Sequence, residues 1–359
     1  MEPNGNRSGA SSSGRAGLLA SRAMAHTLWA LTLVLIFMGA LVKSHEAGLS
    51  VPDWPTTYGQ NMFLFPPSEW RANVFYEHTH RLVASLVGFL TLALCGWTML
   101  RDGRAWVWGC AELAVVLVLL QGALGGLTVI FLLPASLSVA HGVLAQTFLL
   151  VTIFLAYVFS AERGRRLDAA ADGHAPAVAR WAILLTGAIW VQLVLGAVMR
   201  HTESGLAIPD FPTMGGRWIP TFDATMLAWI NDWRLTRTFE TGINLPDVTV
   251  GQVLIHAAHR CFALAVLGVG IGLAHSAWRG RTSNSSTVRT AFGALLLLSI
   301  QIALGAATVL SAKQPLVTSL HVVVGAALLG LSWLCALQAL PLQFARTKRA
   351  TPDAATRVT

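Results

Sequence analysis

Four histidines in this sequence occupy settings that occur twice, and imidazole chemistry suggests a common purpose for them. His80 and His259 each stand directly before an arginine, whereas His141 and His321 lie 180 residues apart, each after a similar glycine-containing segment. An imidazole nitrogen binds a metal ion or the iron of a haem. Two such pairs on facing helices predict two sites for a metal or a haem. The alternative is that the four side chains only join helices by hydrogen bonds.

A carboxylate accompanies only one of the two histidine settings. Glu77 precedes His80 by three residues, so both side chains lie on one face of a helix. The corresponding position before His259 is taken by His256. We therefore expect two similar sites with different tasks, in which Glu77 is the candidate acid or base. The alternative is that Glu77 only caps the start of its helix.

Arginines and glycines complete the two settings. Arg81 and Arg260 follow the first histidine of each pair, and a guanidinium group pairs well with carboxylates such as the propionates of a haem. Snorkelling of these arginines to the membrane surface is the alternative. Small residues let helices approach closely and would leave room for a flat macrocycle. The glycines in suitable positions are Gly122, Gly125, Gly126, Gly142 and Gly305.

An internal repeat relates the two halves of the chain. Residues 48–56 (Gly-Leu-Ser-Val-Pro-Asp-Trp-Pro-Thr) match residues 205–213, and residues 121–129 match residues 301–309. The spacing of matched positions grows from 157 to 179 residues, so the second half carries about 22 extra residues in its first outer loop. Each half has an even number of spans, which predicts two halves in the same orientation, related by an axis along the membrane normal.

The composition excludes a soluble protein. The 359 residues are 54% hydrophobic and only 12% charged, with a mean hydropathy of +0.60, whereas soluble domains carry roughly 25% charged residues. A soluble globular enzyme, a disordered chain and a coiled coil are excluded, and lipid is the expected solvent. The four cysteines lie in apolar stretches without a CxxC pair, which argues against a zinc ribbon, an iron–sulfur cluster or a disulfide framework.

Eight uncharged runs approach the roughly 20 apolar residues that a helix needs to cross a bilayer. They lie at residues 23–42, 82–100, 113–133, 135–161, 181–199, 261–278, 290–312 and 314–345, and the sixth extends back to 248 if Arg260 is accommodated. Pro134 separates the third span from the fourth, and residues 313–315 separate the seventh from the eighth, so both pairs are predicted hairpins. The fold class is an all-α membrane protein of two tandem four-helix bundles.

Basic residues gather in the segments that these spans place on one side of the membrane. The positive-inside rule puts both termini on the cytoplasmic or matrix side. It also explains the net charge of +8 without a nucleic-acid partner. The predicted organisation is a disordered tail (1–22), an N-terminal half (23–161), a cytoplasmic linker (162–180), a C-terminal half (181–345) and a cytoplasmic tail (346–359).

The remaining polar positions are expected to carry less chemistry. The outer loops, near residues 44–76 and 200–249, are predicted to contain short proline-bounded segments rather than domains. Glu112 is expected to face the membrane interface. The histidines outside the repeated settings are interpreted as solvated or incidental, namely His26, His45, His78, His174, His201 and His275.

Taken together, these motifs resemble the haem A synthase family. The resemblance rests on Glu77-His-Thr-His80-Arg81-Leu, the Pro-Asp-Trp-Pro loop, the second His-Arg pair, the Leu-Gly-(Gly/Ala)-x-Thr-Val segments and the two late histidines, over about residues 25–340. It implies an eight-span membrane enzyme that oxidises the C8 methyl group of haem O to a formyl group through a hydroxylated intermediate. The oxygen is expected to come from water, and the product, haem A, serves terminal oxidases.

The resemblance implies a resident haem b in the C-terminal half. His259 and His321 are the expected axial ligands of its iron, and Arg260 is the expected cofactor-binding arginine. Some relatives carry a cysteine pair in the outer loops, where this chain has threonine, tyrosine, methionine and glycine at 56–58 and 213–215. The chain therefore resembles the cysteine-lacking branch, which includes proteobacterial and mitochondrial members.

The resemblance implies that the N-terminal half binds haem O as substrate. His80 and His141 are the expected axial ligands of the substrate iron, and Arg81 is the expected substrate-binding arginine. Glu77 is the expected catalytic residue.

Two other functions fit the sequence in part. A dihaem b-type electron-transfer protein would also need two bis-histidine sites, but an unduplicated Glu77 has no task in it. A proton-coupled transporter would use a relay of Glu and His, but no midplane break interrupts the histidine spans. The expected partners are haem O, haem A and membrane lipid; haem O synthase, cytochrome oxidase assembly factors and a second copy of the chain stay open. The expected location is the bacterial inner membrane, with the mitochondrial inner membrane as the alternative.

Overall fold

The computed structural model describes residues 7–168, 175–242, 244–280 and 285–340. The α-helices within these residues are α1 (Arg7–Ser44), α2 (Asn73–Arg101), α3 (Ala105–Ile130), α4 (Ala135–Val158), α5 (Ala161–Asp168), α6 (Pro176–His201), α7 (Ala224–Thr241), α8 (Val250–Gly280), α9 (Ser285–Leu310) and α10 (Pro315–Ala339). Short 3-10 helices, η1 (Pro67–Glu69) and η2 (Ser204–Leu206), lie in the two outer loops. All the α-helices except α5 and α7 are long and apolar enough to cross a membrane. The predicted all-α fold with eight spans is confirmed.

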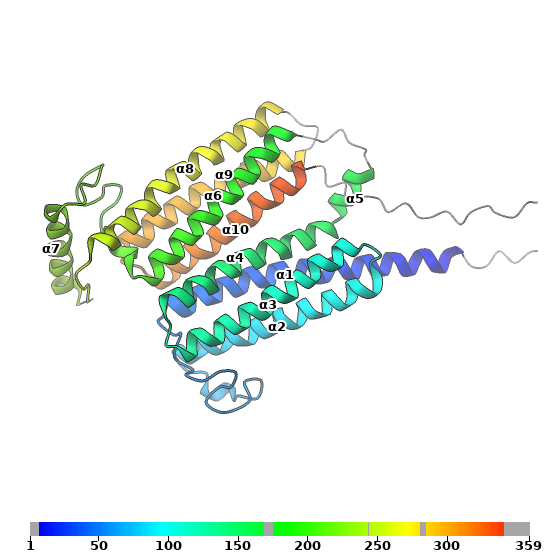
Figure 1. Ribbon diagram of the computed structural model, residues 1–359, viewed down its shortest axis with the longest axis horizontal. Coiled ribbons are helices and arrows are strands. Elements are labelled where there is room, and N and C mark those ends of the chain that lie inside the picture. The colour runs from blue at the N-terminus through cyan, green and yellow to red at the C-terminus, as the bar shows by residue number, and fades with distance from the viewer. Residues whose placement is uncertain (1–6, 169–174, 243, 281–284, 341–359) are drawn as a thin grey trace, which may run out of the picture.

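The eight long helices form two groups of four. Figure 1 shows α1–α4 together in one group and α6, α8, α9 and α10 in the other, with their axes roughly aligned. The groups meet where α10 packs against α1 and α4, and where α4 packs against α6. The start of α1 and the end of α10 lie at the same end of the molecule as α5, which we call the inner end. Helix α7 projects from the opposite, outer end.

Tight turns join α3 to α4 and α9 to α10. Leu132 and Leu133 have φ values of 59° and 60°, and Ala312 and Lys313 have φ values of 51° and 63°. Two successive left-handed residues reverse the chain within a few positions. A proline follows at or next to the start of the next helix, where its missing N–H is not needed. The two predicted hairpins are therefore present, and each closes with the same backbone device.

Each group of helices has its own apolar core, and further apolar side chains cover its outer surface. Leu94 is buried in the core of α1–α4, and Leu273 is buried in the core of the other group. On the outside, Leu119, Leu264 and Leu296 have exposed fractions of 61%, 68% and 62%. Monomeric soluble proteins rarely expose large apolar patches, whereas such side chains are solvated by lipid tails.

Helix α1 begins at Arg7, so the prediction of a disordered tail up to residue 22 is wrong. The stretch from 7 to 22 is rich in Ser, Ala, Arg and Gly and contains no proline. Because helix propagation is far easier than nucleation, the first span extends backwards through these residues. Residues 1–6, 169–174 and 341–359 lie outside the described residues, and the predictions for them remain predictions.

The second outer loop contains α7, so the prediction of only short proline-bounded segments is wrong for this loop. Asp223 caps the helix by accepting a hydrogen bond from the backbone N–H of Met226 at 2.8 Å, and Gly242, with a φ of 71°, ends it. Met226 and Ile230 are buried in one cluster with Val253 at the start of α8. The extra residues that the repeat assigns to this loop thus include a helix that packs on the outer end of the C-terminal half.

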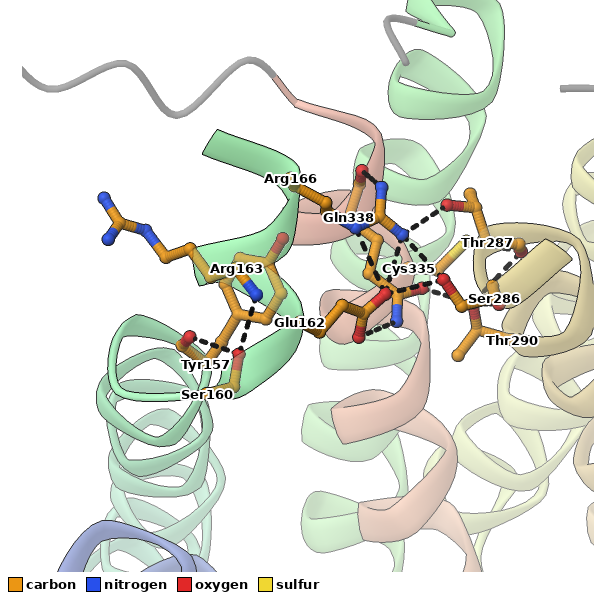
Figure 2. A network of polar contacts seen from close by, with 10 residues as sticks. All are labelled: Tyr157, Ser160, Glu162, Arg163, Arg166, Ser286, Thr287, Thr290, Cys335 and Gln338. Atoms are coloured by element: carbon orange, nitrogen blue, oxygen red, sulfur yellow. Dashed lines mark hydrogen bonds and ion pairs between the residues drawn. The ribbon is translucent and has the colours of Figure 1, made fainter. Parts of the chain in front are cut away.

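A polar network ties α5 to α9 and α10 at the inner end (Figure 2). Glu162 accepts hydrogen bonds from Ser286 at 2.6 Å and from Gln338 at 3.0 Å, and it forms an ion pair with Arg166 at 2.7 Å. Arg166 also donates to the carbonyl oxygen of Gln338 at 2.6 Å and to the hydroxyl of Thr287 at 3.1 Å. Since α5 follows the last long helix of the N-terminal half, this network joins the two halves.

We expect Glu162→Gln to lower the thermal unfolding midpoint at neutral pH and to remove part of its dependence on acid. Burial raises the pKa of Glu162, but hydrogen bonds from Ser286, Arg166 and Gln338 outweigh it and hold the pKa below its ordinary value of 4.5. A lowered pKa in the folded state contributes stability above the ordinary pKa, and this stability is lost as the pH falls through the folded-state pKa. Thermal unfolding in detergent from neutral pH to below 4.5 measures both effects. An acid dependence equal to that of the wild type would contradict this assignment.

Candidate functional site

The four repeated histidines form two facing pairs near the outer end of the helices. His80 in α2 interacts electrostatically with His141 in α4, and His259 in α8 interacts in the same way with His321 in α10. Each lies six to nine residues after the start of its helix, which is about 9–14 Å along the axis. All four residues are half-buried. The structure thus brings together the two pairs that the repeat predicts.

Each of the four imidazoles rests against a glycine of a neighbouring helix. A Cβ atom at these glycines would lie 3.0–3.2 Å from the Cε1 atom of the ring, closer than the 3.4–4 Å of ordinary contact. A larger residue at these positions would force the imidazole ring to shift by a few tenths of an ångström. The glycines at 125 and 305 were predicted from the sequence, whereas those at 39 and 196 were not, although these two occupy matched positions of the repeat. The contacts are Gly39 with His80, Gly125 with His141, Gly196 with His259, and Gly305 with His321.

Arg81 and Arg260 hold the two repeated Pro-Asp-aromatic-Pro loops. Arg81 donates from Nη1 to the carbonyl oxygens of Asp53 at 2.7 Å and Thr56 at 3.1 Å, and from Nη2 to that of Val51 at 2.8 Å. The guanidinium groups are thus directed to the loops, and a contact with a haem propionate stays a prediction. The equivalent bonds of Arg260, at 2.8, 3.0 and 3.0 Å, go to the carbonyl oxygens of Asp210, Thr213 and Ile208.

Glu77 and His256 make equivalent contacts in the two halves with different chemistry. The buried Glu77 accepts a hydrogen bond from the backbone N–H of Val51 at 2.8 Å and forms an ion pair with Arg81 at 2.6 Å. The buried His256 has its Nδ1 3.1 Å from the backbone nitrogen of Ile208 and its Nε2 3.1 Å from the Nε of the arginine four residues later. A carboxylate accepts both bonds at once, whereas a neutral imidazole accepts at only one nitrogen.

Asp53 and Asp210 order the loops from within. Asp53 accepts hydrogen bonds from the backbone N–H groups of Tyr58 and Gly59, both at 2.8 Å, and Asp210 accepts from those of residues 215 and 216 at 2.8 and 2.9 Å. Burial raises the pKa of each carboxyl group, but the hydrogen bonds outweigh it and hold the pKa below its ordinary value of 3.8. Both carboxylates therefore shape the loop backbone that the arginines hold.

Trp54 of the first loop packs directly on helix α3. A Cβ atom at Gly126 would lie only 2.5–2.8 Å from atoms of the indole ring. The glycine before it in the chain contacts His141, so the first loop and the first histidine pair share one short stretch of α3. At the matched positions of the second half, the chain has Phe211 and Ala306, a smaller ring and a larger partner.

We expect Gly126→Ala to displace the first loop, and Trp54→Phe in the same chain to relieve the displacement. A methyl group at 126 overlaps the indole, whereas the double variant reproduces the pairing of Phe211 with Ala306. Overpacking of this kind costs about 1–3 kcal/mol, so the single variant should show a clearly lowered thermal unfolding midpoint. Gly122→Ala is the matched control, because a Cβ atom there meets nothing within 4 Å. No recovery in the double variant would contradict the proposed contact.

His78 is buried, so its interpretation as a solvated or incidental histidine is wrong. Its ring lies 5.2 Å from that of Phe65 and 4.8 Å from that of Trp70, measured between centroids, and its Nδ1 is 3.2 Å from the hydroxyl of Thr57. The first outer loop folds back over the start of α2, which the repeat does not reveal because the matched residue in the second half is an alanine. Glu112 is exposed near the inner end of α3, and its place at the membrane interface stays a prediction.

Arg200, which the sequence analysis passed over, joins the two halves at the outer end. Its Nη2 donates to a backbone carbonyl oxygen of α1 at 2.7 Å and to the hydroxyl of Ser44 at 2.8 Å. Glu203, just after α6, forms ion pairs with Lys43 at 2.7 Å and Lys313 at 3.0 Å. A basic residue at the end of an otherwise uncharged span was the available signal.

The two histidine sites fit a haem better than a bare metal ion. No group of three or more His, Cys, Asp or Glu side chains within the described ranges is placed to hold a metal ion by itself. Two facing imidazoles bind a haem iron from its two sides and need no further protein ligand. The Nδ1 atoms of His80, His141 and His321 are buried and have no hydrogen-bond partner in the part of the chain that the structure describes. Together with the glycines behind the rings, these unpartnered imidazoles fit a haem.

The fold and the two sites define a multi-pass membrane protein in which each four-helix half presents a facing pair of histidines. The chain belongs to the family described as cytochrome oxidase assembly protein, whose family model matches residues 22–333.

Several curated relatives bear the name Heme A synthase. The relative from Sphingopyxis alaskensis is 26% identical over 345 residues, which cover 86% of this chain and 90% of that protein. The relative from Shewanella oneidensis is 29% identical over 275 residues, covering 67% and 80%. The relative from Shouchella clausii is 28% identical over 199 residues, covering 52% of this chain and 62% of that protein, which is less than two thirds of its length. The resemblance to the haem A synthase family is confirmed.

Proposed function

We propose that this chain is a haem A synthase, which oxidises the C8 methyl group of haem O to a formyl group through a hydroxylated intermediate. One observation carries the proposal: two histidine pairs of like construction differ in that only the first has a carboxylate, Glu77, where the second has His256. Such a difference suits an enzyme in which one haem is changed and another is kept. The name of the relatives that match most of this chain supports the same function.

In this proposal the N-terminal pair is the substrate site. His80 and His141 bind the iron of haem O from its two sides. Arg81 contributes a positive charge beside a propionate while its Nη groups hold the first loop. Glu77 is one helical turn from His80, close to the rim of a haem held by that histidine.

The C-terminal pair is the proposed site of a resident haem b. His259 and His321 would hold its iron, and Arg260 would contribute the neighbouring positive charge. A haem in this place would supply one-electron chemistry.

The protein's own contribution to the reaction is positioning and proton removal. Oxidation of a methyl group with oxygen from water releases protons as well as electrons, so the substrate site needs a group that accepts a proton. Glu77 has this capacity and is buried beneath the first loop, where Arg81 and a backbone N–H fix both of its oxygens. Trp54, packed on Gly126, and the arginine-held backbone keep the loop in place and limit access of water.

Two other functions explain fewer of these observations. A dihaem electron-transfer protein would explain both histidine pairs, but it gives no task to a buried carboxylate present in one half only. A proton-coupled transporter would favour broken helices at midplane. The histidines instead lie on the continuous helices α2, α4, α8 and α10. Haem A synthesis explains all of these observations.

Location and partners follow from the same proposal. We place the chain in the bacterial inner membrane, with the mitochondrial inner membrane as the alternative, and its termini on the cytoplasmic or matrix side. A farnesyltransferase that makes haem O must supply the substrate, and assembly of a terminal oxidase consumes the product. Direct docking with haem O synthase or with oxidase assembly factors, and association of two copies of this chain, are open parts of the proposal.

Expression in a host that makes haem O but no haem A tests this function. Haems extracted from the membranes and separated by chromatography should include haem A, and His80→Ala should remove it. A chain that binds two b-type haems in such cells but yields neither haem A nor a hydroxylated haem would be an electron carrier. A chain that binds no haem at all would overturn both haem-based functions.

A further inference from the structure

Three of the four histidines are held by a glutamine from a neighbouring helix, and the fourth is not. The three hydrogen bonds run from Nε2 of the glutamine to the backbone carbonyl oxygen of the histidine. In the C-terminal half, the amide nitrogen of Gln192 also lies 3.2 Å from both ring nitrogens of His259. The bonds, at 3.0, 2.9 and 2.9 Å, join Gln121 to His141, Gln192 to His259, and Gln301 to His321.

The glutamines occupy one position of a repeated pattern. Each stands four residues, about one helical turn, before the glycine that contacts the same histidine. On α1 that glycine is Gly39, and four residues earlier the chain has Leu35. A leucine side chain neither donates nor accepts a hydrogen bond. His80 therefore has the glycine of the pattern but lacks the glutamine.

A glutamine in this position acts on its histidine in two ways. The Nε2 bond holds the histidine's backbone to the next helix, inside a membrane where such polar contacts help to join helices. The amide nitrogen can also restrain the imidazole itself: that of Gln192 lies 3.2 Å from both ring nitrogens of His259, and that of Gln121 lies 3.4 Å from Nε2 of His141.

We propose that Leu35 makes His80 the releasable axial ligand, while Gln121 keeps His141 fixed on the opposite side of the same site. The inference rests on the proposed function only in that the N-terminal half takes up substrate. A substrate site must admit one haem and release another, whereas a resident cofactor has to stay bound. Leu35 and the three glutamines are thus positioning residues. They make one of two similar histidine sites exchange its haem and the other retain it.

Release of haem b from the purified full-length protein tests this inference without any turnover. The protein is loaded with haem b in detergent, apomyoglobin is added as the acceptor, and the transfer of haem is followed by absorbance. We expect two phases, of which the fast one is absent in His80→Ala. Leu35→Gln should slow the fast phase roughly threefold to tenfold, the effect of one interhelical hydrogen bond. Gln301→Leu should speed the slow phase by a similar factor.

Leu31→Gln is the matched control, since Leu31 lies one turn earlier on α1 and is partly buried against the same cluster as Leu35. It should leave both phases unchanged. A fast phase that is unaltered in Leu35→Gln, or equally slowed in Leu31→Gln, would overturn the inference. If Leu35→Gln does not fold, an unaltered slow phase in Gln301→Leu overturns it alone. If the release rates are as expected but cells produce no haem A, the proposed function is wrong and the inference about haem release stands.

Discussion

Replacement of His259 or His321 by alanine is expected to abolish most of the low-spin b-type absorbance of the purified protein. Each change removes an axial ligand from a site where, among the described residues, no third His, Cys, Asp or Glu joins the pair in a metal-binding group. A glycine contacts each ring, and a glutamine holds the backbone of each histidine. An iron with one remaining axial ligand cannot keep a low-spin bis-histidine spectrum. Absorption spectra and extracted haem per protein give the measurement.

The companion variant is His80→Ala, which leaves the C-terminal pair intact. It should retain the resident haem b while failing to produce haem A. Normal haem content in both His259→Ala and His321→Ala would show that the resident haem lies elsewhere. A loss of all haem in His80→Ala would show that the two sites are not independent.

Glu77→Gln is expected to stall haem A formation while the protein still folds and binds haem b. The amide keeps the shape of the side chain but cannot accept a proton. General acid–base catalysis contributes about 10²–10⁴-fold, so the defect should be severe. Haems extracted from cells should then contain haem O or a hydroxylated haem and little haem A. Chromatography of these extracts is the measurement.

Because Glu77 also anchors the first loop, a second variant must separate anchoring from catalysis. Glu77→His transplants the anchor that the second half uses at His256. If anchoring is the whole task of the side chain, this variant should give near-normal haem A, and Glu77 leaves the mechanism. If the carboxylate is needed, haem A should remain low even though the thermal unfolding midpoint is close to that of the wild type.

The spans were predictable because an uncharged run must form a helix inside a membrane. The histidine pairs were predictable because the matched settings of His80 and His259 mark equivalent positions of the two repeats. Helix α7 was not predictable from the same patterns. It is not among the helices apolar enough to cross a membrane, and charged residues occupy its second half, so only its cap at Asp223 and its buried Met226 and Ile230 define it.

The tasks of the polar neighbours were harder to predict, because a side chain of one type serves several purposes. From the sequence, Arg81 could pair with a haem propionate or with backbone carbonyl groups. Only the folded loop shows that it bonds to backbone carbonyl oxygens. Gln121 and Gln301 stood at the head of the matched segments, yet their purpose depends on a carbonyl group 20 residues later. The absence of a glutamine at Leu35 on α1 is evident only when this position is compared with the three matched positions that have one.

The different anchors of the two loops have an electrical consequence. In the first half, Glu77 and Arg81 form an ion pair and carry no net charge together. In the second half, His256 faces two donors and so contributes no negative charge, and Arg260 leaves one unit of positive charge at the equivalent place. Positive charge stabilises the reduced form of a neighbouring redox group. If two haems occupy these sites, this difference in charge favours electron transfer toward the C-terminal haem, away from the proposed substrate site.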